Sequence, residues 1–299
     1  MPIKPQYKES CVTSISTISK LAVLALLLLT ACSGINMNRY LQVRELVPGE
    51  RILNPERAGK AVYDSRSGTM YVMGLEQQII YFFRSGRNVN SLGRLGGDRD
   101  KFLRLSDIAL DVDGSILCLD SAAKVIKKFS SDGAYQGEVE LKGLSQPEKF
   151  CVSGDQSIYI YDAGPQEIIC LSSFSGDIAF RFGKFQVQNI SDLSCSRELV
   201  VAYSRASNTS KIYNSLGAEI RSSEGFWAFD SYSNAYLWDG VGLHYYNRGA
   251  IEPVGRQMPT GFGKAPETGA TISIDGRYLV FSSLEFCQLY EIVYADQYE

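Results

Sequence analysis

A short unit of β-strands and tight turns recurs along most of this chain and constrains its fold more than any other feature. In the clearest copy, residues 106–133, apolar and polar residues alternate, as they do in strands buried on one face. Asp113-Gly114 separates the first two strands, and glycine favours a tight hairpin there because it adopts positive φ without steric cost. The sequence therefore predicts an all-β protein built from repeated hairpins.

Copies of the unit follow one another at a nearly constant spacing. The steps between the middles of successive second strands are about 36 to 46 residues, a period typical of β-propellers. The last unit lacks a fourth strand of its own, whereas residues 40–47 alternate and precede the first unit. We expect an all-β, six-bladed β-propeller over 40–299, with the ring closed by this N-terminal strand, since closure removes exposed strand edges. The strand middles are Tyr71, Leu117, Tyr159, Val200, Tyr236 and Leu279.

The segment from Gly96 to Gly133 also resembles a known repeat. It has a glycine-led linker, then Phe102, Ile108-Ala109 and Asp113-Gly114. In these residues it is similar to the NHL-repeat family of six-bladed propellers, particularly the lipoprotein members from Bacteroidetes-type bacteria. The resemblance extends loosely over 60–293 and implies the same ring, although the fourth unit has no Asp-Gly turn.

The start of the chain has the layout of an export signal. A basic segment precedes the uncharged apolar run 21–29, which is too short for a membrane span of about 20 residues. Leu29-Thr30-Ala31-Cys32 resembles the lipobox of bacterial lipoproteins. The resemblance implies a signal peptide at 1–31, a lipid on Cys32 and a tether at 32–39. An ordinary cleaved signal and an uncleaved short anchor are the alternatives.

The residue after the cysteine bears on location. Ser33, in place of aspartate, resembles the sorting signal of outer-membrane lipoproteins. We therefore predict a lipid-anchored protein of the bacterial cell envelope, in the outer membrane rather than the inner, whose membrane contact is the lipid on Cys32. The formal net charge of −3 gives no electrostatic footprint for nucleic acid, so we expect no such partner.

Few residues point to catalysis. His244 is the only histidine, which excludes a multi-histidine metal site and disfavours a Ser-His-Asp triad. Aspartates recur at strand ends, where they could either converge on the axis as metal ligands or accept hydrogen bonds from their own turns. Recurrence at one place per unit favours the turns, so we expect no metal and no cofactor. These residues are Asp111, Asp120, Asp162, Asp230, Asp239 and Asp275.

Cysteine usage leaves the pairing open. Seven cysteines are present, and five remain if residues 1–31 are removed and Cys32 is lipidated. An odd number leaves at least one free thiol, and the sequence does not say which pair, if any, forms. Cys118 and Cys170 lie in apolar runs, so we interpret them as buried.

Aromatic residues gather in the fifth unit and are the candidate ligand-binding residues: Trp227, Trp238, Tyr245 and Tyr246. Exposed aromatics would suit a sugar or peptide groove, and an aromatic-rich core is the alternative. With so few catalytic groups, we predict a non-catalytic binding or scaffold module, not an enzyme, whose propeller face binds a protein or glycan. Two alternatives stay open, because fold alone does not decide function. They are a metal-dependent hydrolase of the lactonase type and a small-ligand or glycan sensor or carrier.

Overall fold

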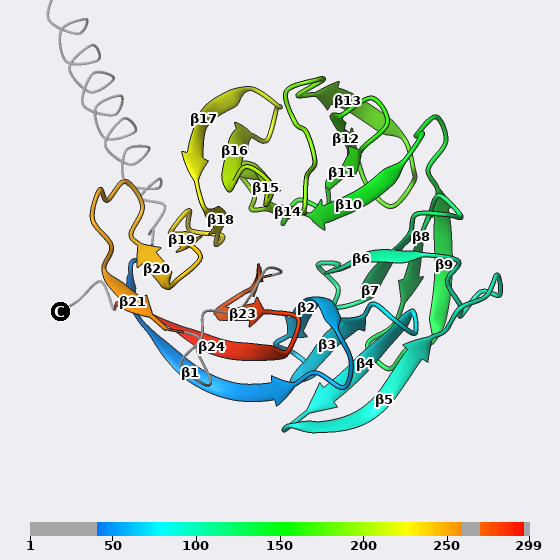
Figure 1. Cartoon of the computed structure of the whole chain (residues 1–299), viewed down its shortest axis with the longest axis horizontal. Helices are drawn as coiled ribbons and strands as arrows, with labels where there is room; N and C mark the ends of the chain where they lie inside the picture. The colour runs from blue at the N-terminus through cyan, green and yellow to red at the C-terminus, as the bar shows by residue number, and fades with distance from the viewer. Residues whose placement is uncertain (1–40, 259–269, 296–299) are drawn as a thin grey trace, which may run out of the picture. The chain divides into compact units, whose positions relative to one another are not determined.

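The computed structural model describes residues 41–258 and 270–295, and in these ranges every regular element is a β-strand. The strands form six four-stranded sheets in which sequence neighbours pair antiparallel. The sheets stand around a central axis as blades (Figure 1). The predicted six-bladed β-propeller is therefore confirmed. No helix in the described ranges is long and apolar enough to cross a membrane.

The blades are numbered here in chain order, from the innermost strand outward. Blade 1 holds β2 (Ala58–Asp64), β3 (Thr69–Gly74), β4 (Ile79–Arg84) and β5 (Arg87–Gly93), and blade 2 holds β6 (Leu105–Leu110), β7 (Ile116–Asp120), β8 (Val125–Phe129) and β9 (Tyr135–Glu140). Blade 3 holds β10 (Pro147–Val152), β11 (Ile158–Asp162), β12 (Glu167–Leu171) and β13 (Ile178–Phe182). Blade 4 holds β14 (Asp192–Cys195), β15 (Leu199–Ser204), β16 (Thr209–Asn214) and β17 (Glu219–Glu224). Blade 5 holds β18 (Phe226–Phe229), β19 (Ala235–Trp238), β20 (Leu243–Tyr246) and β21 (Gly255–Gln257), and blade 6 holds β22 (Thr271–Asp275), β23 (Tyr278–Ser282), β24 (Phe286–Tyr294) and β1 (Val43–Leu53).

Blade 6 is completed by the N-terminal strand, as predicted. β1 pairs antiparallel with β24, from Val43 opposite Tyr294 to Leu53 opposite Phe286. The strand runs beyond the predicted end at residue 47, because Pro48 does not stop it. β1 is the outermost strand of its blade, where a proline costs no ladder bond on its free side, and a register shift follows at Pro48.

Apolar residues pack between neighbouring blades. One cluster joins blades 3 and 4 through Tyr159, Cys170 and Tyr213, and comparable clusters lie between other blade pairs. Second strands such as β3 are buried along their whole length, whereas the outer β5 is mostly exposed. Each blade thus buries both faces against its neighbours, and the stability of each depends on the closed ring.

The fourth unit lacks an Asp-Gly turn but makes a hairpin by other means. The Ser196 hydroxyl accepts the backbone N–H of Leu199 at 3.2 Å, and the Ser196 N–H donates to the Leu199 carbonyl at 2.9 Å. A serine that accepts backbone amides of its own turn is a recognised alternative to aspartate. The fourth unit therefore keeps the hairpin without the Asp-Gly pair that marks the repeat in the second unit.

Candidate functional site

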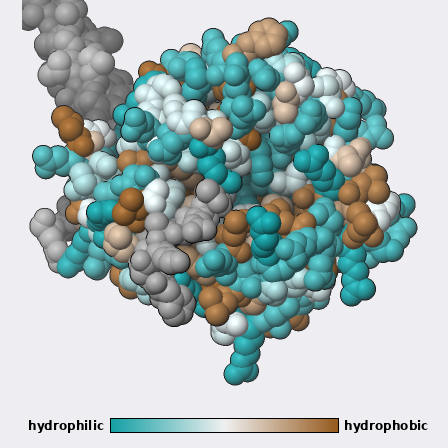
Figure 2. All heavy atoms as spheres, viewed as in Figure 1, coloured by the Kyte–Doolittle hydropathy of each residue, from teal (hydrophilic) through white to brown (hydrophobic). Residues whose placement is uncertain are grey.

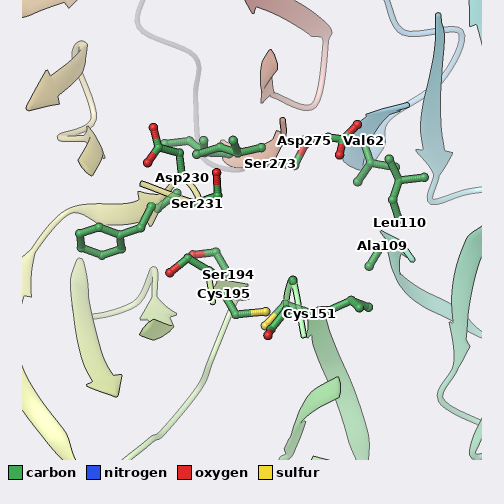
Figure 3. Close-up of a pocket in the computed structure, with 18 of the residues that line it drawn as sticks. Val62, Ala109, Leu110, Cys151, Ser194, Cys195, Asp230, Ser231, Ser273 and Asp275 are labelled. Atoms are coloured by element: carbon green, nitrogen blue, oxygen red, sulfur yellow. The ribbon is translucent and has the colours of Figure 1, made fainter. Parts of the chain in front are cut away.

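The six innermost strands surround a cavity of about 400 Å³ on the propeller axis. Residues from the carboxyl ends of all six strands and from the turns that follow line the cavity. Figure 3 shows several of them around the open space, among them Cys151, Cys195 and Asp230. Figure 2 shows a largely hydrophilic surface around a hollow near the axis. The cavity is the natural candidate site, because small-molecule sites are concave and carry a few convergent polar groups.

Lys60 on β2 lies at the inner end of this cavity and is buried. Its ammonium Nζ is 3.4 Å from Asp107 Oδ1 on β6 and 3.3 Å from Asp192 Oδ1 on β14. Burial by itself would lower the pKa of Lys60, but the two carboxylates outweigh it and hold that pKa above its ordinary value. The ammonium is therefore charged at neutral pH in a place largely closed to water.

The two carboxylates of this axial charge cluster (Lys60, Asp107 and Asp192) are not equivalent. Asp107 is anchored, since it accepts the Phe150 N–H at 2.9 Å and the Ile108 N–H at 2.9 Å. Asp192 Oδ2 is buried and has no hydrogen-bond partner among the described residues. Burial raises the pKa of Asp192, the Lys60 charge opposes that rise and the Asp107 charge adds to it. Asp192 thus carries a buried carboxylate that fewer hydrogen bonds support than Asp107 has.

β-bulges accompany two members of this cluster, Lys60 and Asp107. In blades 1, 2 and 3 the pairing of the innermost strand with the second strand shifts just before or at Lys60, Asp107 and Lys149. Bulges re-aim side chains and recur next to active sites. Together with Asp192 in blade 4, the equivalent positions carry charges of alternating sign in four consecutive blades.

Lys60 also lines a second cavity of about 280 Å³, together with Ala58, Asp192 and Thr271. These residues lie at the amino ends of the innermost strands, whereas the first cavity is lined by their carboxyl ends. The axial charge cluster therefore separates two cavities along the axis. Thr271 Oγ1, like Asp192 Oδ2, is buried without a partner among the described residues.

The aspartates at the mouth of the first cavity bind other groups of the propeller. Asp230 accepts bonds from the Tyr232 N–H at 2.9 Å and the Tyr236 hydroxyl at 3.1 Å. Asp111 binds the Lys128 ammonium at 2.6 Å, and Asp275 accepts the Ser65 N–H at 3.1 Å. Asp230 thus stabilises its own turn, as interpreted from the sequence, whereas Asp275 joins blade 6 to blade 1 through Ser65.

The described residues do not fit a divalent cation. No group of three or more histidine, cysteine or acidic side chains in 41–258 and 270–295 is placed to hold one. At the axis, where such ligands would converge, the carboxylates of Asp107 and Asp192 already hold the Lys60 ammonium. We therefore derive no chemical step through a metal.

The four predicted ligand-binding aromatics do not form one site. Trp238 and Tyr245 are buried in the core shared by blades 5 and 6, where the Trp238 ring centroid is 4.7 Å from that of Phe281. Trp227 and Tyr246 are half-buried and contact each other at 5.5 Å between centroids. None of the four lines the axial cavity, and a ligand role for them stays a prediction.

Two other sequence candidates lie away from the axial cavity or outside the structure. His244 on β20 bonds Asp239 Oδ2 through Nε2 at 2.8 Å and does not line the cavity. The lipidation residue Cys32 lies outside the described residues. Sequence reasoning missed Lys60 altogether. The available signal was the charged residue just before the first apolar pair of the first three units, at Lys60, Asp107 and Lys149.

No model of a known protein family matches the sequence, and no curated protein matches it. Several solved structures do. A gluconolactonase from Xanthomonas campestris has a TM-score of 0.59 at 12% identity, over 84% of this chain and 98% of the gluconolactonase. Virginiamycin B lyase from Staphylococcus aureus has a TM-score of 0.55 at 10% identity, over 83% of this chain and 100% of the lyase. A catalytically inactive variant of that lyase with quinupristin has a TM-score of 0.53 at 13% identity, over 80% of this chain and 82% of the variant chain. At these identities the likeness establishes the fold.

The prediction of a non-catalytic binding module, and with it the prediction that the chain is not an enzyme, is contradicted by these likenesses. The structures that share the fold belong to enzymes, a gluconolactonase and a lyase. The prediction rested on the scarcity of catalytic clusters along the sequence. Such clusters along the sequence are a poor guide in this fold, because a propeller axis gathers polar groups from distant strands, as it gathers Lys60 and Asp192.

Proposed function

We propose that the axial cavity is the active site of a hydrolase or lyase acting on a small molecule, and that ring-opening hydrolysis of a lactone is its reaction. The observation that carries the proposal is the buried, charged Lys60 ammonium at the inner end of a cavity of about 400 Å³. The gluconolactonase that shares the fold supports the lactone as the substrate class.

For this reaction the main contribution required of the protein is electrostatic stabilisation of the transition state. Water adds to the ester carbonyl carbon, the ring C–O bond breaks, and the product is a hydroxy acid. Negative charge develops on the carbonyl oxygen during the addition, and a fixed ammonium in a water-poor site stabilises that charge. Lys60 would supply this charge, while Asp107 and Asp192 act as positioning residues that hold its Nζ within 3.3–3.4 Å.

The test is a pH-stat assay of acid release from a panel of lactones, including gluconolactone, with the purified protein. Lys60→Met is expected to lower kcat by about 100-fold or more, the usual cost of losing an oxyanion donor. Lys127→Met is the matched control, because Lys127 is also buried but binds backbone carbonyls of Asp98 and Lys101 away from the cavity. Circular dichroism confirms that each variant is folded. Failure of the wild-type protein to hydrolyse any lactone, or unchanged kcat in folded Lys60→Met, would overturn the proposal.

A lyase reaction is the second candidate, motivated by the lyase that shares the fold. Replacing a histidine with alanine makes that lyase catalytically inactive. In this chain the only histidine, His244, does not line the axial cavity. This difference is why hydrolysis is proposed first. Product analysis by mass spectrometry separates the two, because hydrolysis adds the mass of one water and elimination adds none.

We also propose that the protein is exported and anchored through a lipid on Cys32, on the support of the 21–32 pattern. We further propose that the chain is related to NHL-repeat lipoproteins, on the support of the resemblance in the segment from Gly96 to Gly133. Expression of the full chain and of Cys32→Ala, followed by membrane fractionation, tests the anchor. The variant is expected in the aqueous fraction, and equal membrane recovery of both chains would refute lipidation.

A further inference from the structure

Two cysteines face each other in the wall of the axial cavity. Cys151 lies on β10 and Cys195 on β14, the innermost strands of blades 3 and 4, and both line the cavity. Figure 3 shows their sulfur atoms pointing toward one another. Cys195 lies close enough to Cys151 to contribute to the raised pKa of the Cys151 thiol. The sequence spacing of these residues gives no hint of this contact, because a blade separates them along the chain.

The two thiols differ in accessibility. Cys151 is buried, with 6% of its surface exposed, whereas Cys195 is half-buried beside the cavity. Burial, with a further contribution from the neighbouring Cys195, raises the pKa of the Cys151 thiol. Cys195 is therefore the thiol that a small reagent reaches first, and Cys151 is placed to react with whatever Cys195 has bound.

We propose that Cys151 and Cys195 are a redox-active pair that exchanges with a small disulfide to form a reversible bond between blades 3 and 4. In the first step the Cys195 thiolate attacks the disulfide, forms a mixed disulfide and releases one small thiol. In the second, Cys151 loses its proton, attacks the Cys195 sulfur and releases the second small thiol. Two protein thiols are oxidised and one small disulfide is reduced to two thiols, so electrons balance.

The bond would lie close to the axial charge cluster. Cys151 is near enough to Lys60 for the two groups to influence each other's pKa. Oxidation would fix the spacing of β10 and β14 where they line the cavity. The proposal concerns the thiols alone, so it does not depend on the reaction proposed for the cavity.

The experiment treats the native full chain with oxidised glutathione, blocks remaining thiols with iodoacetamide and maps the products by peptide mass spectrometry. A linked pair of peptides holding Cys151 and Cys195 is expected, and dithiothreitol should remove the link. In Cys151→Ser the reaction should stop halfway, with glutathione retained on Cys195. In Cys195→Ser neither product should form.

Cys118→Ser is the matched control, because Cys118 is buried in the core between blades 1 and 2 and does not line the cavity. It should form the Cys151–Cys195 link as the wild type does. Glutathione left on wild-type Cys195 without closure, a link to another cysteine, or no reaction at Cys195 would each overturn the proposal.

Discussion

Lys60 and Asp192 meet across the axis of the propeller, with Nζ and Oδ1 3.3 Å apart, although they belong to blades 1 and 4. In a ring of six blades these two stand opposite each other. Most contacts between blades join neighbours, whereas this ion pair spans the ring. The contact requires all intervening blades to be in place, which makes it sensitive to the geometry of the whole propeller.

Removing the ammonium should destabilise the fold and change how stability depends on pH. Lys60→Met leaves Asp107 and Asp192 as buried carboxylates without a cation, a loss expected to cost about 3–5 kcal/mol in the free energy of unfolding at pH 7. Because burial already raises the pKa of Asp192, the loss should become smaller as pH falls and a carboxyl is protonated. Urea unfolding at pH 7 and pH 5 measures both effects. The Nζ of Lys127 binds backbone carbonyls and not carboxylates. The loss of unfolding free energy in Lys127→Met should therefore be the same at both pH values.

The same lysine predicts a loss of stability in alkali. The pKa of Lys60 in the folded protein lies above its ordinary value of 10.5, since two carboxylates outweigh the effect of burial. A raised lysine pKa contributes stability that is fully present below the unfolded pKa and is lost as pH rises through the folded one. The melting temperature of the wild type should therefore fall more steeply above pH 10.5 than the melting temperature of Lys60→Met. Parallel curves for the two proteins would contradict the assignment.

The buried face of the closing strand β1 should contribute much more to the stability of the fold than its exposed face. Leu46 on β1 is buried in the core shared with blade 5, with 2% of its surface exposed, whereas its neighbour Val47 is 40% exposed. Leu46→Ala is expected to lower the free energy of unfolding by about 2–5 kcal/mol through the lost contacts and the cavity left behind. Val47→Ala, on the solvent face, should change it by no more than about 0.5 kcal/mol. Equal effects in denaturant titrations would mean that β1 is not packed as described.

Two glycines test the hairpin turns. Gly114 has φ +87, and a Cβ there would meet Arg66 at 2.5 Å, so Gly114→Ala should cost about 1 kcal/mol or more in stability. Gly154 occupies the corresponding turn of blade 3 with nothing within 4 Å of an added Cβ and no positive φ. Gly154→Ala should therefore be neutral or slightly stabilising. Differential scanning calorimetry of the pair separates a conformational requirement from a general effect of substituting glycine.

The two tryptophans should respond differently to a quencher. Trp238 is 5% exposed and lies in the core of blades 5 and 6, whereas Trp227 is half-buried and lies near Arg221. Acrylamide should therefore quench the Trp238→Phe variant, which retains Trp227, more strongly than the Trp227→Phe variant. A glycan titration on the same variants tests the predicted ligand role of the aromatics. Any ligand-induced change should persist in Trp238→Phe and be absent from Trp227→Phe.

The ring was predictable because its evidence is local. Alternation of apolar residues, the turn at Asp113-Gly114 and the period of the repeat are read within a few dozen residues, and the unpaired segment before the first unit supplied the closing strand. The predicted closing strand ended at residue 47, whereas β1 runs to Leu53, and only the sheet shows that Pro48 lies on an outer edge.

The site was not predictable in the same way. Lys60, Asp107 and Asp192 become neighbours only through the radius of the ring and the bulges that turn two of them inward. The conspicuous aspartates Asp230 and Asp275 accept backbone hydrogen bonds, the first within its own turn and the second from Ser65 of the neighbouring blade. In a propeller, equivalent positions of successive units carry more information about the site than any local motif does.

The closing strand also affects the order in which the propeller can be completed during synthesis. β1 is among the first segments of the propeller to be synthesised, yet its partner β24 comes roughly 240 residues later, so β1 waits unpaired while the blades between them assemble. A chain truncated before β24 leaves the edge of β1 unpaired and exposed, and this exposed edge distinguishes incomplete chains from complete ones.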